Sequence, residues 1–195
     1  LVQQAIAESP GMVRAGGMEV ALLRRTGQAE EARARLAHWR TVDPPSSFLR
    51  HEAVLLGAAD EGLWAHLASD PERVLELTVD YMALGLWDDA HALLARRFAA
   101  TGVVAEPGTA LPQDYPLVAY YRGYCAERVG RSGREDFALA SRQSTRYVFP
   151  NRPESLVVLR RATEESPEDA TAHFLLGSLL LSGGQADAAL AEWER

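Results

Sequence analysis

The stretch from residue 167 to residue 193 constrains the fold more than any other part of the sequence, because it describes a complete helical hairpin. It reads PEDATAHFLLGSLLLSGGQADAALAEW. An apolar helix around Gly177 is ended by Gly184, and Ala189 and Trp193 then share one face of a second helix. Two antiparallel helices of this size cannot bury their apolar faces alone, so the pattern predicts packing against neighbouring hairpins.

The spacing of this hairpin occurs three times in the chain. A glycine is followed by an alanine five residues later and by a large apolar residue four further on. The sets are Gly27, Ala32 and Leu36; Gly85, Ala90 and Leu94; and Gly184, Ala189 and Trp193. We expect the glycine to end the first helix in a left-handed conformation. The alanine would let the two helices approach closely, and the third residue would fill the space between hairpins.

Further helices are expected from apolar periodicity and from proline and glycine breaks. They cover residues 12–26, 28–40, 44–57, 61–67, 71–84, 117–129, 135–143 and 154–165, and residues 1–8 read as the tail of another helix. In residues 135–143 we expect Ala138, five residues after Gly133, to be the closely packed alanine. Residues 101–116 contain three prolines and two glycines, which predicts a long loop insertion that serves as a connector rather than as an active-site lid.

These elements predict an all-α fold, an α-solenoid of stacked antiparallel helical hairpins with irregular repeats, over a single domain of residues 1–195. The chain begins at Leu1 rather than at methionine and stops at Arg195 within an amphipathic pattern. We therefore expect it to be a piece of a longer polypeptide, in which a following helix would cover Trp193. In the given sequence we expect the face around Trp193 to be partly exposed or buried in a neighbour.

The composition argues against several classes of function. The formal net charge of −7 disfavours free nucleic acid as a partner, because a phosphate backbone requires a basic face. Cys125 is the single cysteine, so a disulfide within the chain and a thiolate metal cluster are excluded, and a small core residue is the favoured role. The single cysteine favours a reducing compartment, and we expect a cytoplasmic protein. No apolar run reaches the length of a membrane span.

Two long runs carry a resemblance to a known family, YPLVAYYRGYCAERVG and YVFPNRPESLVVLRRATEESPEDATAHFLLGSLLLSGGQADAALAEW. They resemble the C-terminal helical-repeat region of large bacterial proteins, in which tetratricopeptide (TPR) repeats follow a domain of unknown function. That preceding domain is similar to the mutarotase-type β-sandwich of carbohydrate-active enzymes. The resemblance implies a TPR-like scaffold, and it implies that the full-length protein could be such an enzyme.

No catalytic, cofactor-binding or metal-binding residues are predicted. The five histidines include no pair three or four positions apart on one helix, which a local metal site would need. Asp88 and Asp89 are expected to begin a helix, where carboxylates complement the helix dipole. The segment RVGRSGRED surrounds two glycines with arginines but lacks the Walker spacing and lysine. A helix–helix turn is favoured there, with anion binding as the alternative.

One asymmetry of charge indicates a candidate binding surface. Residues 116–161 contain nine arginines and four acidic residues, a net charge of +5, whereas the remainder carries −12. With Gly123 aligned to Gly177, we expect a set of aromatic and charged side chains to project toward the concave surface: Tyr120, Tyr124, Glu127 and Arg128. Aromatic rings and arginines suit polypeptide binding. The alternative is that the tyrosines pack against the long loop or the next hairpin.

The predicted function is a non-catalytic protein–protein interaction or scaffold module, which binds a protein segment or a companion domain of the same chain. The alternative, which rests on the resemblance, is an accessory helical region that supports the active site or assembly of a glycan-processing enzyme. Homo-oligomerisation is a third alternative.

Overall fold

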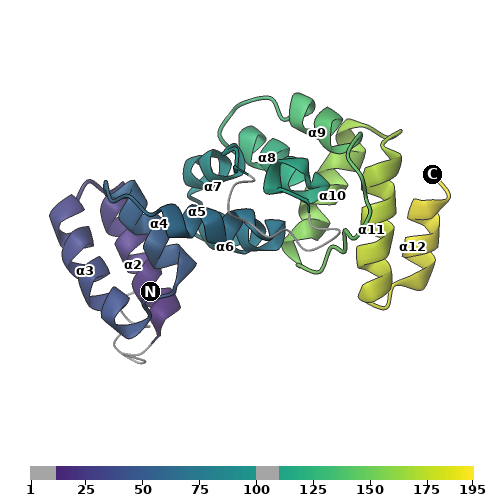
Figure 1. Ribbon diagram of the computed structural model, residues 1–195. Coiled ribbons are helices and arrows are strands. Elements are labelled where there is room, and N and C mark those ends of the chain that lie inside the picture. Colours follow the sequence, from purple (N-terminus) through teal and green to yellow (C-terminus); the bar gives the residue numbers. More distant parts are fainter. Residues whose placement is uncertain (1–11, 100–109) are drawn as a thin grey trace. The chain divides into compact units, whose positions relative to one another are not determined.

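The protein is all-α, as the sequence predicts. The computed structural model describes residues 12–99 and 110–195, and over these ranges it contains eleven α-helices and no β-strand. The chain divides into two compact units, Leu1–Trp64 and Ala65–Arg195, and each is described here by itself. The helices and their labels follow the chain in Figure 1.

The first unit contains α2 (Val13–Arg25), α3 (Ala29–Val42) and α4 (Ser47–Leu55). The start of α5 (Glu61–Ala68) also belongs to it. The core of this unit is formed by apolar residues from the first three helices: Val20, Ala32, Leu36, Trp39, Leu49 and Ala53. The fully buried carboxylate of Glu52 accepts hydrogen bonds from Arg24 at 2.7 and 3.0 Å, and it therefore has a cationic partner in the interior.

The second unit contains α6 (Pro71–Ala83), α7 (Trp87–Leu94), α8 (Pro116–Arg128), α9 (Arg134–Ala140), α10 (Glu154–Glu165), α11 (Ala170–Ser182) and α12 (Ala186–Trp193). Helices α6 and α7, α8 and α9, and α11 and α12 form helical pairs, and α10 packs against α8 and α11. Helix α8 contacts α6, α7, α9 and α10. It therefore lies at the centre of the second unit, and its side chains are shared among several packing surfaces.

The turns of four hairpins have the same geometry. Gly27, Gly85, Gly130 and Gly184 each have φ between +70° and +81°. In every case the amide of the residue after the glycine donates to the carbonyl five residues earlier, at 2.9 Å, as from Gln185 to Leu180. This is the Schellman arrangement that satisfies the last carbonyl groups of a helix. The predicted role of glycine in ending the first helix of each hairpin is confirmed.

The alanines of the repeated pattern lie in the interior, as their predicted role in close helix packing requires. Ala32, Ala90 and Ala189 are completely buried. Leu36 and Leu94 are buried as well, whereas Trp193 is 41 % exposed. The expected partial exposure of the Trp193 face is therefore confirmed.

Several boundaries differ from the prediction. Helix α4 begins at Ser47 rather than at residue 44, with the Ser46 hydroxyl accepting from the Leu49 amide. Helix α9 ends at Ala140, and Ala138 is only half-buried, so its predicted role is wrong. The buried residues of α9 are Phe137 and Ala140 instead. Gly130 is the left-handed glycine that ends α8, as its alignment with Gly184 predicts, and only the count of five residues from Gly133 to the packed alanine fails.

The predicted helix tail at residues 1–8 and most of the predicted loop lie outside the described residues. Of residues 101–116, the structure describes 110–116, where Pro112–Asp114 form a short 3₁₀ helix and Pro116 begins α8. None of the helices in residues 12–99 and 110–195 combines the length and the apolar character that a membrane span requires.

Candidate partner-binding surface

All four candidate residues lie on α8, which begins at Pro116. Proline suits the first helical turn, because its fixed φ is helical and its missing amide donor is not needed there. Helix α8 is buried on most of its surface, because four other helices pack around it. The four candidate side chains therefore enter different environments, and each has to be considered separately.

Tyr120 is a core residue. Its side chain is fully buried between α8 and the start of α11, where its hydroxyl donates to both carboxylate oxygens of Asp169 at 2.9 Å. Asp169 in turn caps α11 by accepting from the amide of Ala172 at 3.0 Å. Burial, with the neighbouring Asp169 charge, raises the pKa of Tyr120. The expectation that Tyr120 projects toward the concave surface is wrong, because its side chain is fully buried and its hydroxyl donates to the buried carboxylate of Asp169.

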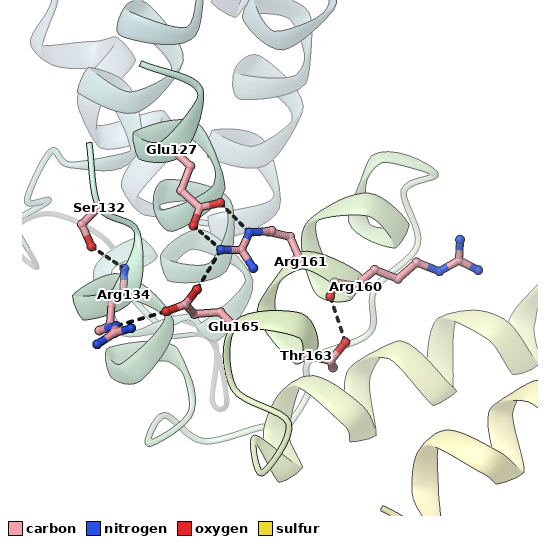
Figure 2. Close-up of polar contacts among 7 residues, drawn as sticks. All are labelled: Glu127, Ser132, Arg134, Arg160, Arg161, Thr163 and Glu165. Carbon is pink, nitrogen blue, oxygen red and sulfur yellow. Dashed lines mark hydrogen bonds and ion pairs between the residues drawn. The ribbon is translucent and has the colours of Figure 1, made fainter. Parts of the chain in front are cut away.

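Glu127 lies within an ion-pair network that joins α8 to α10 (Figure 2). Nε and Nη2 of Arg161 both donate to the Glu127 carboxylate at 2.8 Å, and Nη2 also donates to Glu165 at 2.7 Å. Arg134 donates to the other oxygen of Glu165 at 3.1 Å. These hydrogen bonds raise the pKa of Arg161 and lower that of Glu165. Glu127 therefore holds two helices together within the unit.

Tyr124 and Arg128 remain together at the surface, where α7 adds Trp87. The guanidinium carbon of Arg128 lies 4.9 Å from the centre of the Trp87 ring and 5.8 Å from that of Tyr124. The two rings meet edge to face, with centroids 6.2 Å apart and planes at 71°. Both rings are half-buried, and Arg128 is exposed. We call Trp87, Tyr124 and Arg128 the aromatic–arginine cluster.

Two groups lie beside this part of α8. Arg131, in the turn after α8, donates from Nη1 to Nδ1 of His91 on α7 at 3.4 Å, because a guanidinium can only donate. The pKa of His91 is lowered, first by burial and then by the positive charge of Arg131. His91 is therefore neutral near pH 7, and it leaves the charge of Arg131 uncompensated.

Sequence reasoning missed Trp87. A signal for it exists, because Trp87 is a large aromatic residue at the first position of α7, immediately before Asp88 and Asp89. The first position of the second helix does not belong to the buried set that packs the hairpin. A tryptophan at this position therefore indicates a contact outside the hairpin. The two aspartates do lie in the first turn of α7, as predicted.

The other chemical candidates in the sequence are Cys125 and the segment RVGRSGRED. Cys125 is fully buried, and burial raises the pKa of its thiol to about 12, which makes it a poor nucleophile. The segment RVGRSGRED forms the turn between α8 and α9, where the backbones of Gly123 and Gly133 approach so closely that neither position has room for a side chain. Among the described residues, no group of three potential metal ligands occurs.

A second exposed surface lies on the C-terminal hairpin. It holds a cavity of about 360 Å³ lined by Ala170, His173, Phe174, Glu192, Trp193 and Arg195. The indole of Trp193 donates to the Phe174 carbonyl at 3.2 Å and lies where a methyl group on Gly177 would be. Phe174 is 46 % exposed. This surface is apolar, and nothing among the described residues covers it.

Comparison with protein-family models and with curated proteins gave no match for this sequence.

Proposed function

We propose that this chain is a non-catalytic, TPR-like interaction module that binds a protein segment at the aromatic–arginine cluster. In this proposal the hairpins of residues 65–195 stack as an irregular α-solenoid, and α8 presents the binding residues. Four helix pairs with the same left-handed glycine, three of them with a fully buried alanine at matching spacing, support the repeat character.

The observation that carries the proposal is that Arg128 is exposed and stacked on aromatic rings without an ion-pair partner among the described residues. Its exposed guanidinium lies over two aromatic rings, and no carboxylate of the described residues lies within ion-pair distance of it. Stacking on rings fixes a guanidinium at small entropic cost and leaves its donors directed outward. Clusters of aromatic residues and arginine are typical of binding hot spots.

The position of Arg128 has a purely local benefit as well. It lies in the last turn of α8, where a positive charge complements the helix dipole. That benefit requires only the charge, and it would be served equally by a lysine or by an arginine that extends into solvent. It does not account for the two rings from different helices that hold the guanidinium.

The test is capture of a partner by the double variant Tyr124→Ala/Arg128→Ala. We expect the parent chain to retain one or a few proteins from a lysate and the double variant to lose them, with nearly unchanged melting temperature. The matched control is Arg146→Ala/Tyr147→Ala, because the Arg146 guanidinium also lies over a tyrosine ring, at 5.0 Å, in an exposed loop. Equal capture by the parent and the Tyr124/Arg128 variant would reject this surface.

A further inference from the structure

The arginines around α8 fall into two classes according to their partners. Arg122 is paired with Asp136 at 2.6 Å, and Arg134 and Arg161 are paired with Glu165. Arg128 and Arg131 differ, because no carboxylate of the described residues lies within ion-pair distance of either guanidinium. Both are exposed. Among these arginines around α8, the positive charge without a carboxylate partner in the described part of the chain therefore lies at the C-terminal end of α8 and in the turn that follows it.

The contact between Arg131 and His91 is one that a ligand can replace. At 3.4 Å it is long for a hydrogen bond, and its acceptor is a neutral ring nitrogen. A carboxylate offers Arg131 two charged oxygens in the geometry that a guanidinium prefers. The structure therefore presents two guanidinium groups, one held over aromatic rings and one held weakly, next to each other along the chain.

From this arrangement we infer that the ligand of the aromatic–arginine cluster is a carboxylate-rich protein segment, whose acidic side chains pair with Arg128 and Arg131. This inference rests on the proposed function, since it names the chemistry of the partner at the same surface. It adds Arg131 to the binding residues and His91 to the groups that respond to binding.

A nucleic acid fits this surface less well. Single-stranded nucleic acids bind proteins by stacking bases on open aromatic faces, whereas here Arg128 already lies over both Trp87 and Tyr124. Asp88 and Asp136 also act electrostatically on His91, and Asp136 is paired with Arg122, so few positive charges remain here for a continuous line of phosphates. A short acidic segment needs only the two arginines, and it can avoid these carboxylates.

The inference predicts that binding depends on pH. The charged groups that face His91 are Arg131 and Arg122, which lower its pKa, and Asp136 and Asp88, which raise it. A ligand carboxylate on Arg131 would compensate one of the charges that keep His91 neutral. The bound state would then accept a proton more readily than the free state, so affinity should rise as the pH falls from about 7.5 to about 5.5.

The experiment is a selection of randomised short peptides displayed against the whole chain, followed by titration of the recovered peptides. We expect the recovered peptides to be rich in aspartate and glutamate and to bind about tenfold or more weakly to Arg128→Gln and to Arg131→Gln. The control Arg142→Gln/Arg146→Gln removes two exposed arginines elsewhere and should leave affinity within about twofold.

The outcomes separate this inference from the proposed function. Recovered peptides without acidic residues that still need Tyr124 and Arg128 would overturn the inference and leave the interaction module in place. Acidic peptides whose affinity is unchanged in Arg131→Gln would also overturn it. A selection that yields no peptide sensitive to Tyr124 or Arg128 would overturn both, as would preferential binding of an oligonucleotide at this surface. Melting temperatures of all variants would identify any that fail to fold.

Discussion

Replacing Tyr120 by phenylalanine tests whether this residue belongs to the core or to a partner-binding surface. The substitution removes one hydroxyl and leaves the ring, so the packing of α8 is kept. It removes the donor that reaches both oxygens of Asp169 at 2.9 Å. Asp169 keeps its bond from the Ala172 amide, but the residue is only 3 % exposed, and water therefore replaces the lost hydroxyl poorly.

The magnitude follows from this loss. A hydrogen bond to a charged group contributes about 1.5–3 kcal/mol to stability, and a buried carboxylate that loses its donor lies toward the upper part of that range. We therefore expect Tyr120→Phe to lower the free energy of unfolding of residues 65–195 by about 2–3 kcal/mol. Asp169→Ala should cost about 2–4 kcal/mol, because it removes the cap of α11 and also leaves the Tyr120 hydroxyl without an acceptor.

The assay is urea unfolding followed by circular dichroism, combined with hydrogen exchange of the α11 amides. The exchange measurement assigns the loss to the second unit, because the two compact units need not unfold together. Tyr147→Phe is the matched control, since Tyr147 is 56 % exposed and its hydroxyl meets only Arg146. A loss in Tyr120→Phe no larger than in this control would refute the assignment of Tyr120 to the core. When Tyr120→Phe is combined with Asp169→Ala, it should lower the stability little beyond the loss caused by Asp169→Ala alone, because both changes remove the same hydrogen bond.

Three further changes test the hairpin turns and the ion-pair network. Ala90→Phe should lower stability by about 1–3 kcal/mol through overpacking, whereas Ala92→Phe on the exposed side of α7 should change little; equal melting temperatures would contradict this. Gly85→Ala should cost about 1 kcal/mol in urea unfolding, because φ is +70° while the added methyl would meet only the Trp87 indole nitrogen, at an ordinary contact distance of 3.8 Å. The lowered pKa of Glu165 means that its contribution is present above the ordinary carboxyl pKa and is lost as the pH falls through the lowered value. Arg161→Gln should weaken this acid dependence of unfolding, and an unchanged pH profile would speak against the network.

The hairpin turns could be predicted from sequence because their causes are local. A left-handed residue after a helix favours glycine, and close helix packing favours alanine five residues later. Both requirements act within one hairpin, so the identities of Gly85 and Ala90 are enough to predict the turn and the close packing of the two helices. The packing positions of α9 were harder to predict, because residues 131–133 separate the left-handed Gly130 from the helix, and the close approach of Gly133 to the Gly123 carbonyl is a tertiary contact.

The candidate site was harder to predict because its residues are assigned by distant partners. Spacing from Gly123 places Tyr120 on a helix face, but its role is set by Asp169, which is 49 residues away. Glu127 likewise forms an ion pair with Arg161, which is 34 residues away. Helical periodicity gives the direction of a side chain and does not show what meets it there. Trp87 was missed for the same reason, since its significance depends on α8 packing against α7.

The charge of this region shows why a count of arginines cannot replace the structure. The net charge of +5 over residues 116–161 is a sum that counts arginines in ion pairs together with arginines that have no carboxylate partner in the part of the chain that the structure describes. Arg152 is paired with Glu72 at 3.2 Å, and Arg161 with two glutamates, so these charges are compensated inside the fold. Arg128 is instead placed over rings and Arg131 against a neutral histidine, and both remain available. Arg142, Arg146 and Arg160 are exposed without a carboxylate partner among the described residues as well, but only Arg128 lies over rings from two helices, with Arg131 three residues further on. Because binding to an anion depends on uncompensated charge in a suitable setting rather than on total charge, a partner should be sought first at these two arginines.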